Sequence, residues 1–307
     1  MVTDEKKEEN TLKFVQLSDT HLLRRRPTPG KKVYDPALVT DDGTKLKAAL
    51  RAAATHPQRP DLFFLTGDLV HDGTSDDYRY LHELLDECCD GIPYYLCLGN
   101  HDRHQAFYEG FLGESERTGP YFYSALQDGL RIIALDTSPK DGMAVGALPE
   151  EQLAYLRQEL QAPAPKGSIV ILHHPPVGNV LAGEGNLFVS LMEHISPLRP
   201  ELCEAIRGSD VKAVLSGHTH FTSYIYREGV FYATAASTVC SGDNTASGDM
   251  VMVESSSFLV GEIGEEDVSF GVESMNPGRQ IIAEITNEMI EKNEGSGNRL
   301  TEWRRTN

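Results

Sequence analysis

The order of apolar segments predicts an α/β (α+β) fold in which β-sheets are covered by helices. As far as residue 221, short apolar runs rich in β-forming residues alternate with segments of helical periodicity. After that residue, strand-like runs follow one another directly, as they do in hairpins. Alternating strands and helices followed by consecutive strands are typical of sheets with helices packed on their faces.

The first five elements show this alternation most clearly. Leu12–Leu17 is a short apolar run and predicts a strand. Thr44–Ala54 carries its Leu and Ala residues on one helical face, which predicts a helix. Asp61–Thr66 predicts a buried strand. Ser75 is suited to cap a helix whose apolar residues follow at 3-4-3 spacing, and Tyr94–Leu98 predicts a third strand.

The remaining elements are predicted from shorter patterns. The alternation continues with strands at Leu130–Leu135, Ser168–Leu172 and Val211–Leu215 and with a helix at Pro149–Leu160. The hairpin region comprises Ser223–Arg227, Val230–Thr234, Met250–Val253 and Phe258–Ile263. Asn276–Asn307 has few apolar residues, and we expect a helix followed by a polar end there.

Charge and composition narrow the class of protein. The 307 residues include 28 Lys+Arg and 46 Asp+Glu, a net charge of −18, and this acidic balance argues against a nucleic-acid polymer as partner. No apolar run approaches the roughly 18–20 residues of a membrane span. Met1–Asn10 lacks the apolar core of a secretory signal. The five cysteines are an odd number without regular spacing, so we expect reduced thiols and a cytoplasmic location.

Polar residues of one chemical kind follow five of the predicted strands. The segments are Asp19-Thr20-His21, Gly67-Asp68, Gly99-Asn100-His101-Asp102, His173-His174 and Gly217-His218-Thr219-His220. Ligand sites in α/β sheets collect at the carboxyl ends of strands. Asp, His and Asn together offer nitrogen and oxygen donors for divalent transition metals. Each segment alone could be a turn, but five of them in this order predict one metal site.

The five segments resemble the motifs of the calcineurin-like metallophosphoesterase superfamily, which are D-x-H, G-D, G-N-H-D/E, H and G-H-x-H. The resemblance covers roughly residues 12 to 240 and is closest to class III cyclic nucleotide phosphodiesterases and related glycerophosphodiesterases. It implies a four-layer αββα sandwich, with two mixed β-sheets flanked by helices. We expect this domain to span Leu12 to Ser274, with residues 1–11 and 275–307 as polar extensions.

The resemblance also implies two divalent metal ions that share one carboxylate. The first ion would be held by Asp19, His21, Asp68 and His220, and the second by Asp68, Asn100, His173 and His218. Either His173 or His174 could be the ligand, and the family pattern favours the first. The donors suit Mn²⁺, Fe²⁺, Co²⁺ or Zn²⁺, and the sequence does not choose among them.

Three further residues near the motifs are not expected to bind metal. His101 should face the leaving group, as a general acid or as a hydrogen-bond donor to phosphate. Asp102 should orient a ring or a backbone group, and the alternative is a cap on a helix that begins near Gln105. His71 stands where protein phosphatases and purple acid phosphatases have other residues, and we interpret it as a solvent-exposed loop histidine.

The resemblance implies hydrolysis of a small phosphodiester, either a cyclic nucleotide like 3′,5′-cAMP or a compound such as a glycerophosphodiester. The alternatives are a phosphomonoesterase or nucleotidase on the same metal site, and a non-catalytic metal-binding module. Substrate choice depends on pocket walls, for which Leu22–Val39, Gln105–Tyr123 and Val177–Leu198 are candidates. The resembling phosphodiesterases also lead us to expect a homodimer.

Overall fold

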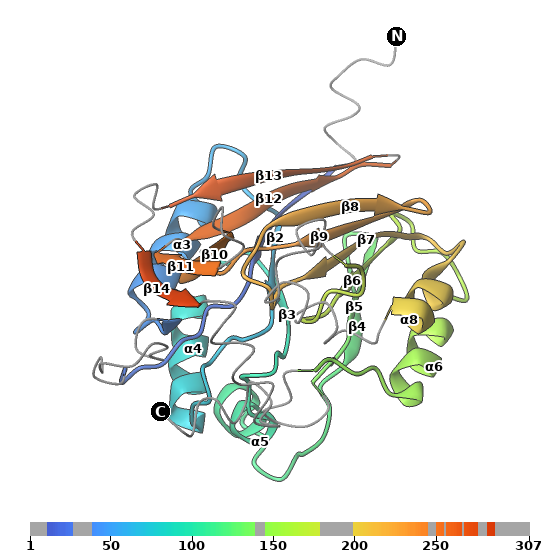
Figure 1. The fold of residues 1–307 in the computed structure, drawn as a ribbon. Coiled ribbons are helices and arrows are strands. Elements are labelled where there is room, and N and C mark those ends of the chain that lie inside the picture. The colour runs from blue at the N-terminus through green and yellow to red at the C-terminus, as the bar shows by residue number, and fades with distance from the viewer. Residues whose placement is uncertain are drawn as a thin grey trace.

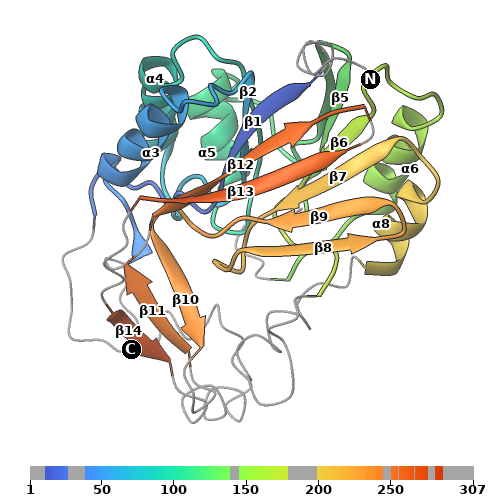
Figure 2. The same ribbon diagram turned by 90° about the horizontal axis from the view of Figure 1, so that it is seen from above.

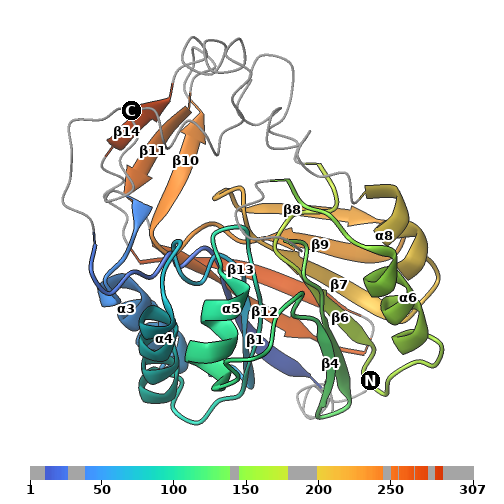
Figure 3. The same ribbon diagram turned by 90° about the horizontal axis from the view of Figure 1, so that it is seen from below.

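The computed structural model describes residues 11–26, 39–138, 145–178, 199–244, 250–254, 256–265, 267–275 and 281–285. Two large mixed β-sheets pack face to face (Figure 1). Helices cover the outer face of each sheet, as Figure 3 shows for α3, α4 and α5 on one side and α6 and α8 on the other. The predicted αββα sandwich is therefore confirmed.

The first sheet has five strands in the order β13-β12-β1-β2-β3. Their bounds are Val268–Ser274, Ser257–Ile263, Leu12–Leu17, Leu62–Thr66 and Tyr94–Cys97. β1, β2 and β3 are parallel, whereas β12 runs antiparallel to β1 and β13 to β12. The covering helices are α3 (Thr44–Ala54), α4 (Ser75–Cys88), the short α5 (His104–Phe107) and the π-helical turn η1 (Tyr108–Leu112).

The second sheet has six strands in the order β4-β5-β6-β7-β9-β8. Their bounds are Tyr123–Gln127, Leu130–Ala134, Ser168–Ile171, Val211–Ser216, Val230–Thr234 and Ser223–Arg227. The four inner strands are parallel, and the two edge strands β4 and β8 are antiparallel to their neighbours. The covering helices are α6 (Glu150–Glu159) and α8 (Arg199–Ile206).

Strand β2 shows how the two faces of a sheet are both buried. Leu62 and Phe64 point into the core between the sheets, whereas Phe63 and Leu65 pack against the helices. All four side chains are fully buried. A strand that is buried on both faces needs a continuous apolar run, which is the pattern that predicted it. Within this core, the rings of Phe64 on β2 and Phe14 on the neighbouring strand β1 meet edge to face at 5.3 Å.

A small antiparallel sheet lies beside α3 and consists of β10 (Cys240–Asn244), β11 (Met250–Glu254) and β14 (Ile281–Ile285) (Figure 2). The helix predicted for Asn276–Asn307 is therefore wrong at Ile281–Ile285, where the chain pairs with β11. β-branched Ile residues favour this strand. The rest of residues 276–307 lies outside the described part of the chain.

The other predicted strands and helices are present within a few residues of their expected bounds. Strands β4, β10 and β13 and helix α8 were not predicted. Most of two candidate pocket walls, Leu22–Val39 and Val177–Leu198, falls outside the described residues, at 27–38 and 179–198. Within the described ranges, no helix combines the length and apolar character that a membrane crossing requires.

Candidate metal centre

Five loops that leave the carboxyl ends of β1, β2, β3, β6 and β7 converge on one site. Parallel strands deliver their following loops to the same edge of a sheet, and the two sheets contribute three and two loops respectively. The structure brings together all seven side chains that the sequence predicts as ligands, namely Asp19, His21, Asp68, Asn100, His173, His218 and His220. Six of these residues are buried and His220 is nearly so.

The loops hold unusual backbone conformations. Five non-glycine residues of the site have positive φ angles, which are 49° at Asp19, 41° at His21, 49° at Asp68, 73° at His218 and 56° at His220. Such conformations are uncommon outside glycine and persist only where surrounding contacts impose them. Here the loops bond to one another, for example from Asp19 N to the Gly67 carbonyl at 3.0 Å. A Cβ atom at Gly99 would overlap the backbone nitrogen of Asp68, so this close approach requires glycine.

Four of the seven side chains form the first group of donors. His21 Nε2 lies 3.1 Å from His220 Nε2, and His220 Nε2 lies 3.3 Å from Asp19 Oδ1. Asp68 Oδ2 is 3.8 Å from His21 Nε2. These are the four residues that the resemblance assigns to the first metal ion.

The second group of donors surrounds Asn100. Its Oδ1 lies 3.2 Å from His173 Nε2 and 3.0 Å from His218 Nδ1. His173 Nε2 is also 3.4 Å from Asp68 Oδ2. Asp68 therefore contacts both groups through the same oxygen.

The donor set fits cations. His173 Nδ1 lies 2.9 Å from the Thr66 carbonyl, which can only accept a hydrogen bond, so neutral His173 presents a lone pair at Nε2. Burial alone would lower the pKa of His173, but the Asp68 carboxylate, together with Asp19 and the Thr66 carbonyl, raises it to about 9. In the metal-free protein, a proton on His173 therefore compensates the negative charge of the buried Asp68 carboxylate, as a bound metal ion would. Nitrogen and oxygen donors without a thiolate suit first-row divalent ions.

His173 and His174 have different surroundings. His173 faces Asp68 and Asn100, whereas His174 Nδ1 lies 2.8 Å from the hydroxyl oxygen of Thr137. The ring of His174 also packs at 4.4 Å from that of His218. Of the two alternatives, the contacts favour His173 as the ligand.

His101 and Asp102 follow Asn100 and point to different surroundings. The backbone N–H of His101 donates to Asp68 Oδ1 at 2.7 Å, and its Nδ1 lies 3.6 Å from Asp72 Oδ1. The Asp102 carboxylate accepts hydrogen bonds from the Tyr78 hydroxyl at 2.7 Å and from the N–H groups of Gly99, Leu69 and Val70 at 2.8, 3.1 and 3.0 Å. The helix-cap alternative for Asp102 is wrong, because α5 begins at His104 after Arg103.

The interpretation of His71 as an exposed loop residue is wrong. Its exposed fraction is 6%, and its Nδ1 lies 2.9 Å from His21 Nδ1. Sequence reasoning also missed Cys240, whose Sγ lies 3.4 Å from His220 Nδ1. No sequence motif includes Cys240. It contacts the site because β10 begins beside the loop that follows β7.

Comparisons with known proteins agree with the motifs. The family model described as Calcineurin-like phosphoesterase matches residues 12–221, which is more than half of the chain. A probable cyclic nucleotide phosphodiesterase of Rhodococcus erythropolis is 34% identical over 232 residues, covering 75% of this chain and 72% of the relative. A cAMP/cGMP dual specificity phosphodiesterase of Mycobacterium tuberculosis is 33% identical, covering 76% and 69%.

A probable glycerophosphodiester phosphodiesterase of Arcobacter nitrofigilis is 29% identical over 231 residues, covering 73% of this chain and 77% of the relative. The family match and the relatives above 30% identity agree with the five motif loops gathered at one sheet edge. The chain therefore belongs to the calcineurin-like phosphoesterase family.

Proposed function

We propose that this protein is a phosphodiesterase that uses two divalent metal ions. The observation that carries the proposal is the position of Asp68, whose Oδ2 lies 3.8 Å from His21 Nε2 and 3.4 Å from His173 Nε2. A carboxylate between two such groups is suited to two cations that share it. The proposed ligands are Asp19, His21, Asp68 and His220 for one ion and Asp68, Asn100, His173 and His218 for the other.

The residues of the site have separate roles in the proposed reaction. Bound at these ligands, two divalent ions would supply a hydroxide near neutral pH and neutralise charge on the phosphate. Asn100 contributes a neutral oxygen, which limits the negative charge of the second group. His101 is held beside the site by its N–H bond to Asp68 Oδ1, and its ring is available to protonate the leaving alkoxide.

The substrate is proposed from the named activities of the relatives. Two of them are named as phosphodiesterases of cyclic nucleotides and one as a phosphodiesterase of glycerophosphodiesters. We propose the same substrate class here, with Mn²⁺, Fe²⁺, Co²⁺ or Zn²⁺ in the site. The cytoplasmic location and the homodimer stay predictions.

A substrate panel tests the proposal. Metal-stripped protein with added Mn²⁺ is offered bis(p-nitrophenyl) phosphate, p-nitrophenyl phosphate, 3′,5′-cAMP, 2′,3′-cAMP and glycerophosphoethanolamine, with Asp68→Ala as the control. We expect Mn²⁺-dependent hydrolysis of diesters that the control lacks. Preference for the monoester would instead establish the phosphomonoesterase alternative, and metal binding without hydrolysis of any compound would indicate a binding module.

A further inference from the structure

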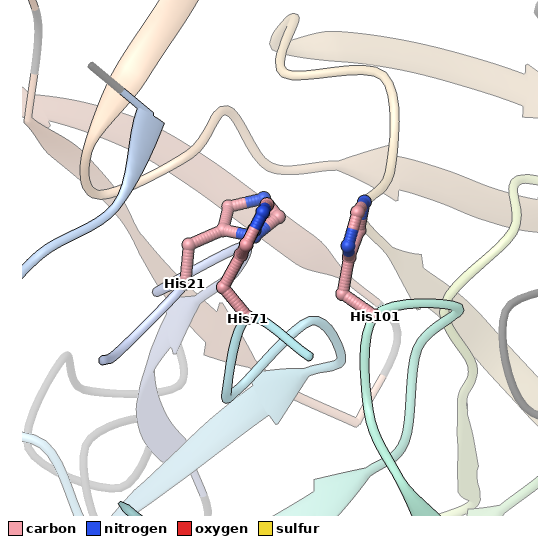
Figure 4. Close-up of side chains that lie close together, drawn as sticks. All are labelled: His21, His71 and His101. Carbon is pink, nitrogen blue, oxygen red and sulfur yellow. The ribbon is translucent and has the colours of Figure 1, made fainter. Parts of the chain in front are cut away.

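Three imidazole rings, those of His21, His71 and His101, lie together at the edge of the metal centre (Figure 4). They come from the loops after β1, β2 and β3. The ring centroids are 5.0 Å apart for His21 and His71, 5.1 Å for His21 and His101 and 4.4 Å for His71 and His101, so each ring contacts the other two. Backbone bonds hold the loop of His71 on both sides. The N–H of His71 donates to the Leu22 carbonyl at 3.0 Å, and the N–H of Asp72 donates to the His101 carbonyl at 2.9 Å.

The contact between His71 and His21 involves one proton. Their Nδ1 atoms are 2.9 Å apart, so one nitrogen must donate and the other must accept. His21 Nε2 is the atom that faces His220 and Asp68. If neutral His21 offers the Nε2 lone pair to a cation, its proton is on Nδ1, and His71 Nδ1 is then the acceptor.

The contact between His71 and His101 is a stack of rings. Their centroids are 4.4 Å apart and the planes differ by 13°. Ring lone pairs lie in the ring plane, so those of two parallel stacked rings do not converge on one ion. This geometry argues against a separate metal site formed by the three histidines. It instead fits one hydrogen bond to His21 and one packing contact that fixes the plane of His101.

We propose that His71 is a positioning residue with two separable roles. Its Nδ1 accepts the proton of His21 Nδ1 and so fixes the tautomer that presents His21 Nε2 to the first metal ion. Its ring packs on His101 and holds that ring in place beside the leaving group. The inference rests on the proposed function, because it requires His21 to be a ligand and His101 to act on the substrate.

Two substitutions separate the roles. In His71→Asn, the amide oxygen stands the same number of bonds from the backbone as Nδ1 and keeps an acceptor for His21, but the ring is lost. In His71→Phe, a ring remains for His101, but the acceptor is lost. His82→Asn on α4 is the matched control, since the His82 side chain is 41% exposed and its Nδ1 lies 3.2 Å from Asp86 Oδ2, outside the metal centre.

The first measurement is the Mn²⁺ dissociation constant of the metal-stripped proteins by calorimetry. Loss of a hydrogen-bond partner of a metal-ligating histidine weakens binding by about 10–100-fold, so we expect this loss in His71→Phe. We expect His71→Asn and His82→Asn to bind like the native protein, within about threefold. Should His71→Phe not fold, His71→Leu replaces it, because it also lacks the acceptor.

The second measurement is the rate at saturating Mn²⁺ on substrates with poor and good leaving groups. We expect His71→Asn to lose about tenfold on the poor leaving group and less on a p-nitrophenyl ester, because His101 is less well held. His71→Phe should keep the native ratio of the two rates. The ratio reports on His101 and does not change with overall stability.

The outcomes distinguish this inference from the proposed function. The role of His71 would be overturned if His71→Phe and His71→Asn bound Mn²⁺ with the same affinity, whether both matched the native protein or both were weakened alike. The proposed function would then remain intact. A native protein that neither binds Mn²⁺ nor hydrolyses diesters would overturn the proposed function, and the role of His71 with it.

Discussion

Asp68 Oδ1 accepts a 2.7 Å hydrogen bond from the backbone N–H of His101, while Asp68 Oδ2 faces both groups of metal-binding donors. The two oxygens of one carboxylate therefore have different tasks. One fixes the loop that carries Asn100 and His101, and the other is the oxygen that two cations could share. A change at Asp68 should consequently affect both the metals and the position of the loop.

Asp68→Ala should lose both metal ions, whereas Asn100→Ala should mainly weaken the second. The reason is that Asp68 Oδ2 belongs to both donor groups, whereas Asn100 contacts only His173 and His218 among the proposed ligands. Metal content after equilibration with Mn²⁺, measured by elemental analysis, checks the prediction. Two equivalents of metal retained by Asp68→Ala would rule out the shared carboxylate.

His101→Ala should bind two metals normally but lose rate in a way that depends on the leaving group. A general acid contributes about 10²–10⁴-fold, so a loss of that order is expected for a poor leaving group such as a ribose or glycerol hydroxyl. On p-nitrophenyl esters the loss should be much smaller, because p-nitrophenolate leaves without a proton. The measurement is kcat for both substrate types, with metal content determined in the same preparation.

A uniform loss in His101→Ala across leaving groups would point to phosphate binding instead of proton donation. Loss of metal would make His101 a ligand. Its backbone N–H, which holds Asp68, is unchanged in this variant, so the effects of ring and backbone are separated.

Metal binding should release protons and strengthen as the pH rises towards about 9. Burial lowers the pKa of His173, but the Asp68 carboxylate, together with Asp19 and the Thr66 carbonyl, raises it to about 9 in the metal-free protein. At pH 7 the ring therefore holds a proton that a cation must displace. Below this pKa, displacement of one proton weakens the apparent affinity by about tenfold for each unit of falling pH.

Calorimetry in buffers of different ionisation enthalpy measures this proton release directly. Asn100→Ala is a useful comparison, because it removes a donor that carries no titrating proton and should leave the pH slope unchanged. An affinity that stays constant between pH 6 and 8 would contradict the assignment of His173 as a ligand.

The motif loops could be predicted because each follows a short, mostly apolar strand whose carboxyl-terminal half is buried. Strand β4 was missed because it is an edge strand whose residues are only half-buried, so its sequence Tyr-Ser-Ala-Leu-Gln shows no clear pattern. β14 was missed because its pairing partner β11 is distant in sequence. In both cases the tertiary neighbour, and not the local sequence, determines the structure.

The burial of His71 could not be predicted for a related reason. A polar loop such as His71-Asp72-Gly73 is typical of a surface turn. What buries His71 is its contact with His21 and His101, which lie 50 and 30 residues away in the chain. The motifs therefore identified the ligands, whereas the residues that support the ligands became visible only in the folded chain.

Asp102→Asn should destabilise the protein more than Tyr78→Phe does, because Asp102 joins the loop after β2 to the loop after β3. Its carboxylate accepts one hydrogen bond from the Tyr78 hydroxyl and three from backbone N–H groups, all in a buried setting. In Asp102→Asn an NH₂ group replaces one of the two accepting oxygens and faces a backbone donor. A buried donor left without an acceptor costs about 1–3 kcal/mol, more where a charge is involved.

Tyr78→Phe removes a single donor from the same carboxylate and also the acceptor of the partly buried Arg103 N–H, which lies 2.9 Å from the hydroxyl oxygen. Water can replace that acceptor at a partly buried group, and the three backbone bonds to Asp102 stay in place. The cost should therefore remain within the roughly 1.5–3 kcal/mol of one bond to a charged group. Urea denaturation of the metal-stripped variants and of the double variant gives both costs and their coupling. Asp102→Asn should also lower kcat, because the shared loop carries Asn100 and His101 and a shift of about 1 Å can cost 10²-fold. If Asp102→Asn were as stable as the native protein and lost only rate, Asp102 would act in the chemistry itself and not by holding the two loops together.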